Sequence, residues 1–244
     1  MARPAKKPAK RAARPAPPKP YHHGDLRRVL IEAALGLAEE GGPQAVSVRE
    51  AARRAGVSAG APFRHFADRD ALMTAVAEEA QRRFRSEIGA ALAEAPAGDP
   101  LKRFRAFGLA YLRWAMGNPA HFEIISSGRH FDHDRATALS RDNAELIALT
   151  KQMLADAFEK GQLRSGELKQ IQITGRALVY GFARMNIDGH LPRWGVTEAE
   201  VERMAESVLD VFIGGITRTA GPQRQREVLS KAGSAAAQGH FDLV

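Results

Sequence analysis

Residues 47–66 read SVREAARRAGVSAGAPFRHF, and this stretch decides the fold. Ser47, followed three residues later by Glu50, forms a capping-box pattern, which predicts that a helix begins here. Gly56 stands where a helix would end with a positive φ, and Ser58 can cap a second short helix. Two short helices joined by such a turn form a helix-turn-helix, which can seat its second helix in the major groove of DNA.

The same region carries a longer pattern. Its elements are Gly56-Val57-Ser58-Ala59-Gly60, Phe63, His65-Phe66, Asp68-Arg69 and Leu72, preceded by the lead-in YHHGDLR at residues 21–27. This pattern resembles the DNA-binding domain of TetR-type transcriptional regulators, and the lead-in resembles that of one subgroup. The chain departs from the family at Phe63, where Tyr is usual, and at Arg69, where Lys is frequent. Pro62 falls inside the expected second helix and removes one intrahelical hydrogen bond, which affects where that helix begins.

Hydrophobic periodicity and end signals predict an all-α protein of about nine helices. The expected segments are 25–40, two short helices within 47–66, 68–95, 100–117, 120–127, 135–160, 167–189 and 197–219. Asp68 and Asp99 are the expected N-caps of 68–95 and 100–117, with Pro100 at the first helical position of the latter, and Thr197 with Glu200 forms a capping box at the start of the last segment. We expect four regions: a basic arm at 1–20, a three-helix DNA-binding domain with its own core at 21–67, a larger helical-bundle domain for ligand binding and dimerisation at 68–220, and a tail at 221–244. The segment 167–189 is apolar on more than one face, so it is either a central core helix or a helix shared with a partner subunit.

Composition narrows the class of protein. The chain has 244 residues, of which 44% are apolar and 26% charged, as in ordinary globular proteins. It lacks cysteine, which excludes disulfides and thiolate metal sites. It also lacks an apolar run long enough to span a membrane. This composition is compatible with the reducing cytosol, and the resemblance to TetR-type regulators implies a cytoplasmic, nucleoid-associated protein without a cofactor.

The positive charge is concentrated in the amino-terminal arm. The formal net charge is +8, and residues 1–20 hold seven basic side chains and no acidic one. Proline and alanine fill the rest of this arm, which favours an extended, disordered segment. The arm is either a salt-dependent tether to DNA phosphates or a solubilising tail.

Candidate DNA contacts lie on and around the second short helix. Ala59, Ala61 and Arg64 are candidates for base edges, because alanine can touch a thymine methyl group and arginine can bind guanine with two hydrogen bonds. Arg49, Arg53 and Arg54 add positive charge nearby. The family resemblance assigns further positions mainly to backbone contact or packing: Ser47, Ser58, Phe63, His65 and Arg69. Gly60 is a further candidate for DNA contact, and its small size lets the two short helices cross closely. Since Phe63 lacks the hydroxyl of Tyr, we expect its ring to pack.

The resemblance also implies a homodimer, formed through the helices at 167–189 and 197–219, that binds a palindromic double-stranded DNA operator and responds to an unknown small-molecule effector. It further implies that large side chains of the second domain line the effector cavity; the candidates are Phe104, Phe107, Tyr111, Trp114, His121, Phe122, Met153, Tyr180 and Met185. Among them, Tyr111, His121 and Tyr180 are expected to present polar groups. Taken singly, each of these residues is better explained as part of an ordinary core.

Other functions find less support in the sequence. The segment GRHFDHD at 128–134 holds His130, Asp132, His133 and Asp134, but their spacing defines no metal geometry, and we predict no metal site. Neither a nucleophile elbow nor a phosphate-binding loop is present. The remaining alternatives are an all-α enzyme with an incidental helix-turn-helix and a non-specific DNA-coating protein. Repression is the expected activity, although the family also contains activators.

Overall fold

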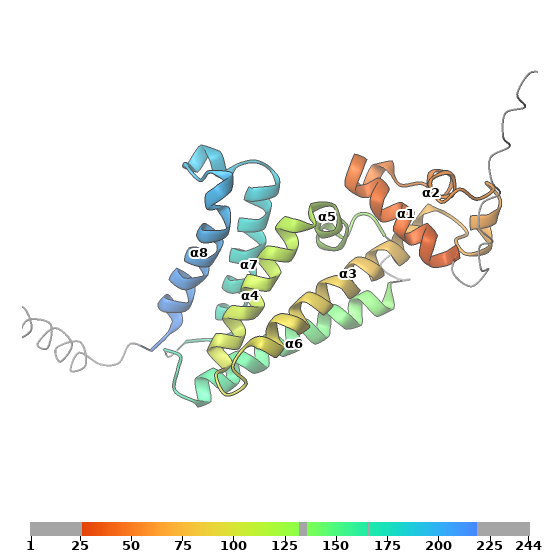
Figure 1. Cartoon of the computed structure of the whole chain (residues 1–244). Coiled ribbons are helices and arrows are strands. Elements are labelled where there is room, and N and C mark those ends of the chain that lie inside the picture. Colours follow the sequence, from red (N-terminus) through yellow and green to blue (C-terminus); the bar gives the residue numbers. More distant parts are fainter. Residues whose placement is uncertain (1–25, 132–135, 165, 219–244) are drawn as a thin grey trace, which may run out of the picture.

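The computed structural model describes residues 26–131, 136–164 and 166–218. In these ranges every regular element is a helix, apart from one isolated bridge between Leu163 and Thr217. The α-helices are α1 (Leu26–Gly41), α2 (Val48–Arg54), α3 (Arg69–Glu94), α4 (Pro100–Gly117), α5 (Pro119–Ser127), α6 (Thr137–Glu159), α7 (Leu168–Ile187) and α8 (Val201–Ile216). Helices α1 and α2 lie at one end of the molecule and α7 and α8 at the other, with α3 running between them (Figure 1). The all-α class predicted from the sequence is confirmed.

Helix α2 begins where the sequence predicts. Ser47 is its N-cap, and the side chain of Ser47 accepts a hydrogen bond of 3.1 Å from the backbone N–H of Glu50. The Glu50 carboxylate bonds to the Arg53 guanidinium, with a distance of 2.9 Å to Nε. Gly56 has a φ of 69°, which turns the chain after α2 at little steric cost.

The second short helix differs from the expectation. It is a 3-10 helix, Ala61–Arg64, so the described chain contains eight α-helices rather than about nine. Ser58 does not cap it with its side chain; Gly60 occupies the N-cap position, and the backbone carbonyl of Ser58 accepts from Ala61. Pro62 has no N–H to donate to the carbonyl of Ser58, so an α-helix capped by Ser58 would lack its first hydrogen bond, and the helix begins later in the chain.

Helix α3 joins the two parts of the molecule and belongs to the core of both. Asp68 caps it as predicted, with Oδ1 2.7 Å from the backbone nitrogen of Ala71. Its first turns bury Leu72 and Val76 against α1, and its last turns bury Ile88 against α4. The core around the helix-turn-helix also includes Ile124, Phe131, Ala136 and Leu139 from the second part. A three-helix bundle with a separate core was therefore a wrong expectation.

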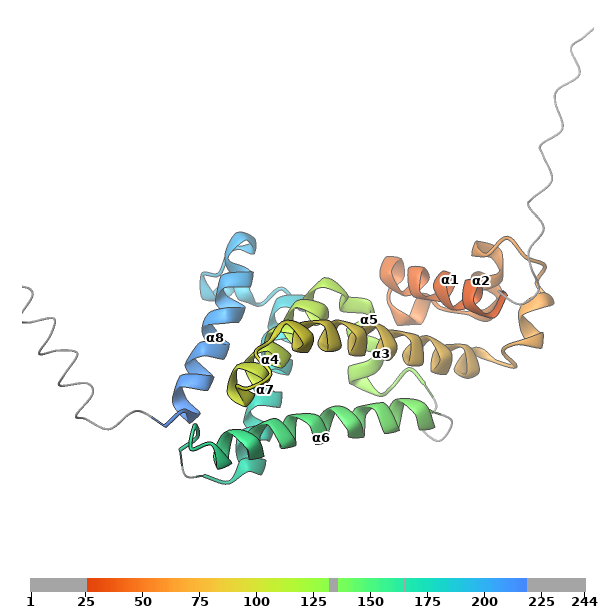
Figure 2. The same ribbon diagram turned by 60° about the horizontal axis from the view of Figure 1, so that its bottom comes forward.

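Helix α4 lies at the centre of the larger part, where α3, α6, α7 and α8 all pack against it (Figure 2). Asp99 caps α4 with Pro100 in its first turn, as predicted. The expected segment 197–219 begins with the capping box of Thr197 and Glu200, confirmed here on a short 3-10 helix that leads into α8. The connection before α7 is tied to the end of α8 by the Leu163–Thr217 bridge.

Helix α7 buries much less than a central core helix would. Within one chain only Gly175, Val179, Phe182 and Ala183 are buried, and α8 buries only Ala205 and Leu209. Ile173 is 58% exposed and Val211 is 74% exposed. Since apolar side chains on both helices remain accessible, the core-helix alternative does not account for the apolar character of this segment.

Some sequence predictions fall outside the described residues. These are the basic arm at 1–20, the lead-in up to residue 25, the tail at 221–244, and Asp132, His133 and Asp134. Within the described ranges, no group of three or more metal-binding side chains occurs. No helix described here is long and apolar enough to cross a membrane.

Candidate functional site

The turn and 3-10 helix after α2 form an exposed surface. From Ser58 to His65 the side chains are accessible, except for the buried Pro62 and the half-buried Ala61. Pro62 anchors the segment to the protein, and it is among the largest fully buried side chains. Ala59, Gly60 and Arg64 therefore remain available to a partner on this face.

Two residues near this surface behave differently from the expectation. Phe63 packs only in part, because half of its surface is exposed. Arg69 turns back to the protein, where Nε donates to the carbonyl oxygen of Val46 at 2.9 Å and Nη2 to that of Pro43 at 2.8 Å. Arg69 thus fixes the loop before α2, while Phe63 adds an apolar contact to the exposed surface.

The surrounding arginines differ in how firmly they are held. Arg54 donates to both carboxylate oxygens of Glu40, at 2.6 and 2.7 Å, and so links α2 to α1. Arg53 pairs with Glu50 in its own helix. Arg49 and Arg64 are exposed, and no ion pair is recorded for either within the described part of the chain. These two carry the positive charge that is most accessible to a nucleic acid.

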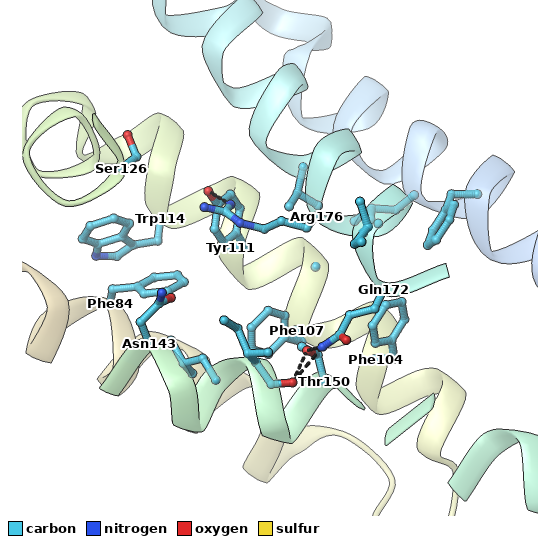
Figure 3. Close-up of a pocket in the computed structure, with 18 of the residues that line it drawn as sticks. Phe84, Phe104, Phe107, Tyr111, Trp114, Ser126, Asn143, Thr150, Gln172 and Arg176 are labelled. Atoms are coloured by element: carbon cyan, nitrogen blue, oxygen red, sulfur yellow. Dashed lines mark hydrogen bonds between the residues drawn. The ribbon is translucent and has the colours of Figure 1, made fainter. Parts of the chain in front are cut away.

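The larger part contains a cavity of about 450 Å³. It lies among α3, α4, α5, α6, α7 and α8, so all six helices of this part contribute side chains. Aromatic rings dominate the wall in Figure 3, with Phe84 and Trp114 at one end and Phe104 and Phe107 nearer the other. The Phe84 ring meets the Tyr111 ring edge-on, with a centroid distance of 5.4 Å. Such a size and lining suit a drug-sized apolar molecule.

The cavity contains some of the residues predicted from the sequence and omits others. Those in the lining are Phe104, Phe107, Tyr111, Trp114 and Phe122. Met153 is buried in the surrounding core, and Tyr180 stacks beside Phe122 with a centroid distance of 5.7 Å, outside the lining. His121 points elsewhere and packs edge-on against Trp114, at 6.4 Å.

The polar groups of the cavity were not predicted from the sequence, except for Tyr111. They are Gln81, Ser126, Asn143, Thr150, Lys169, Gln172 and Arg176. Gln172 donates to Thr150 Oγ1 at 2.7 Å, which joins α7 to α6 across the cavity (Figure 3). Arg176 is the one charged residue of the segment 171–182, and this was the available signal for it.

Arg176 and Tyr111 form a pair in the cavity wall. The guanidinium carbon lies 4.8 Å from the centroid of the Tyr111 ring and 5.4 Å from that of Tyr180. Nη1 of Arg176 donates to the Tyr111 hydroxyl. Burial raises the pKa of the Tyr111 phenol above its usual value, although the positive charge of Arg176 acts in the opposite direction. The phenol therefore remains protonated near neutral pH and keeps a hydrogen to donate.

Helix α5 connects the cavity with the helix-turn-helix. Phe122, Ile125 and Ser126 line the cavity, whereas His121 and Ile124 face α1 and α3. Figure 1 shows α5 between α1 and α4. A molecule in the cavity would thus touch a helix that also packs against the DNA-binding part.

Comparisons with known proteins agree with this architecture. Residues 30–76 match the family model described as bacterial regulatory proteins, tetR family. Residues 104–212 match the model described as tetracyclin repressor-like, C-terminal domain. Among curated proteins, no sequence matches this chain.

Solved structures share the fold over most of the chain. A protein with unknown function from Rhodococcus sp. RHA1 is 30% identical, with a TM-score of 0.71, and the match covers 82% of this chain and 100% of that one. The ketosteroid transcriptional regulator KstR2 of Mycobacterium tuberculosis is 19% identical, with a TM-score of 0.61 and coverage of 79% and 95%. AibR, solved with isovaleryl coenzyme A and operator DNA, is 12% identical, with a TM-score of 0.60 and coverage of 76% and 97%.

Proposed function

Because the chain belongs to the TetR family of bacterial regulatory proteins, we propose that it is a ligand-responsive transcriptional repressor that binds a palindromic operator as a homodimer. One observation carries this proposal: a helix-turn-helix with an exposed reading surface and a largely apolar cavity occur in one chain, joined by α3 and α5. Neither an enzyme nor a DNA-coating protein requires that combination. We expect the protein to act in the cytoplasm on the nucleoid.

The proposed DNA contacts come from the exposed face after α2. Arg64 and the small residues Ala59 and Ala61 would meet base edges, with Gly60 allowing close approach. Ser47, Arg49, Ser58, Phe63 and His65 would meet the backbone or sugar surface. Arg69 is left out of this set, because its guanidinium is already bound to two carbonyl oxygens of its own chain.

The proposed dimer forms through α7 and α8. Both helices leave apolar surface accessible in the single chain, including Val211 at 74% exposure. Gly181 lies in the middle of α7, and a Cβ there would meet no atom within 4 Å. Glycine inside a helix costs about 1 kcal/mol relative to alanine, so a closely packed partner helix supplies a reason for it. A two-fold dimer would present two helix-turn-helices to a palindrome.

Ligand response follows from the two faces of α5. A ligand that contacts Phe122 and Ile125 would move the helix that carries His121 and Ile124 against α1 and α3. DNA binding needs the two readers about 34–36 Å apart, so a change of spacing lowers operator affinity. A coupling of about 1–3 kcal/mol is enough for a several-fold effect. AibR, which has the same fold, was solved with an acyl coenzyme A and operator DNA together.

The test is selection of bound fragments from random DNA by the purified protein. The proposal expects an inverted repeat whose half-site centres lie about one helical turn apart, bound at a stoichiometry of two chains. Recovery of DNA without a common sequence would favour the DNA-coating alternative, and turnover of a metabolite by the pure protein would favour the enzyme. Repression is then checked with a reporter that carries the selected repeat.

A further inference from the structure

We propose that the cavity binds an amphipathic acid, whose anionic head group is held by Arg176 and Tyr111 and whose apolar body lies between the phenylalanine rings. This inference rests on the proposed function, since it names the chemical class of the effector. It concerns the residues of this chain rather than those of any relative.

The charge of the lining excludes a cationic ligand. Two of its side chains are basic, Lys169 and Arg176, and none of the described lining residues is Asp or Glu. A cation would face two positive charges without a compensating carboxylate, whereas an anion gains charge-assisted hydrogen bonds.

Arg176 differs from two neighbouring arginines of the larger part, Arg184 and Arg105, which are paired with carboxylates. Arg184, further along α7, pairs with Glu123 at 2.5 Å and with Asp188 at 2.8 Å. Arg105 pairs with Asp210. Within the described residues Arg176 has no recorded carboxylate partner, and it lies over two aromatic rings instead. Its charge is therefore positioned in the cavity wall but not neutralised there.

The geometry of the pair suits a carboxylate. Tyr111 accepts from Arg176 and retains its own O–H hydrogen, while the guanidinium has further N–H groups to donate. Both residues can thus donate to one anionic group. Phe104, Phe107 and Phe84 leave the remaining wall apolar, so they match a hydrocarbon or ring body.

The experiment compares three ten-carbon probes that differ only in head group: decanoate, decanol and decylammonium. Binding to the full-length protein without DNA is measured by calorimetry at pH 7. We expect decanoate to bind most tightly. Arg176→Gln should weaken decanoate at least about tenfold, the effect of losing one hydrogen bond to a charged group, and Tyr111→Phe should weaken it less. Neither variant should change the affinity for decanol to a comparable extent.

Arg141→Gln is the matched control, because Arg141 on α6 is 71% exposed and lies outside the lining. It removes the same charge and should leave decanoate binding unchanged. The inference is overturned if no probe binds, if decanol or decylammonium binds as tightly as decanoate, or if Arg141→Gln weakens decanoate as much as Arg176→Gln. If the protein selects an operator from random DNA but binds the three probes equally, only this inference is refuted. If it binds decanoate preferentially but selects no operator, only the proposal of a repressor is refuted.

Discussion

His121 on α5 faces Glu39 on α1, with Nδ1 of the histidine 3.7 Å from a carboxylate oxygen of the glutamate. His121 is 1% exposed, and neither of its ring nitrogens has a hydrogen-bond partner among the described residues. The ring also packs against Trp114, which lines the cavity. One side chain therefore lies between the cavity wall and the helix-turn-helix.

Stability should fall in acid because of this histidine. Burial lowers the pKa of His121 below 6.5; the charges of Glu39, Glu32 and Glu79 oppose this, and Arg83 adds to it. A lowered pKa in the folded state means that the unfolded chain binds the proton more readily. Stability that is present above about pH 6.5 is therefore lost as the pH decreases towards the pKa of the folded state. We expect the midpoint of thermal unfolding to decrease between pH 7 and pH 5.

The variant His121→Leu checks this assignment, since leucine fills a similar space without titrating. Its unfolding midpoint should depend less on pH over that interval than that of the natural protein. His190→Leu is the control, because His190 lies exposed after α7. Equal pH dependence in the natural protein and His121→Leu would assign the effect to another group.

Substitutions of Arg64 and Arg69 should have different effects, the first on DNA sequence preference and the second on stability. Arg64→Ala removes an exposed side chain, so thermal unfolding should be unchanged while the preference for the selected repeat over random DNA falls by about 1–3 kcal/mol. Arg69→Ala breaks two hydrogen bonds to backbone carbonyls and should lower the free energy of unfolding by about 1–3 kcal/mol. Binding to repeat and random DNA is measured by fluorescence anisotropy.

Removal of residues 1–20 should change DNA binding in a third way, which the same anisotropy measurement detects. If the arm tethers DNA phosphates, its loss should weaken repeat and random DNA about equally and make the salt dependence shallower. If it is a solubilising tail, the affinity and its salt dependence stay as they are. A loss of sequence preference on truncation would contradict the division of roles between the arm and Arg64.

Local signals in the sequence predicted most of the fold. The caps Ser47, Asp68 and Asp99 and the positive φ of Gly56 depend on a few neighbouring residues, and all were placed correctly. The short helix at Ala61–Arg64 was expected to be longer, although Pro62 was recognised as a disturbance. Whether a proline shortens a helix depends on the tertiary contacts of the residues around it. Pro62 is buried, and local sequence does not reveal such a contact.

The candidate cavity could be predicted only in part. Aromatic residues at helical spacing on α4 and α5 indicated one wall, and Phe104, Tyr111 and Phe122 do lie there. Sequence spacing could not tell which helix crosses opposite, so Arg176 and Gln172 from α7 were missed. His121 shares α5 with Phe122 but faces a different side of the helix, since adjacent helical residues point in directions about 100° apart.

Val211→Glu should dissociate the dimer without unfolding the chain. Val211 is 74% exposed in the single chain, so glutamate costs little there, but it would place an unpaired charge in the proposed interface. We expect a dimer for the natural protein and a monomer for the variant in sedimentation velocity, with operator affinity lost in parallel. Phe158→Glu on α6 changes another exposed apolar residue and should remain dimeric. A dimeric Val211→Glu protein would place the interface elsewhere.

Ile125 should carry part of the coupling between cavity and operator, because it lines the cavity and packs against the cores of both parts of the protein. Ile125→Ala should reduce the effect of decanoate on operator affinity by about 0.5–2 kcal/mol, while each ligand alone binds nearly as before. The coupling is obtained from DNA titrations with and without saturating decanoate. Leu154→Ala is the control: Leu154 is fully buried but lies outside the cavity, so its loss should lower stability by about 2–5 kcal/mol and leave the coupling unchanged. If both variants reduce the coupling equally, the reduction is explained by general destabilisation of the fold, and α5 has no specific role in the coupling.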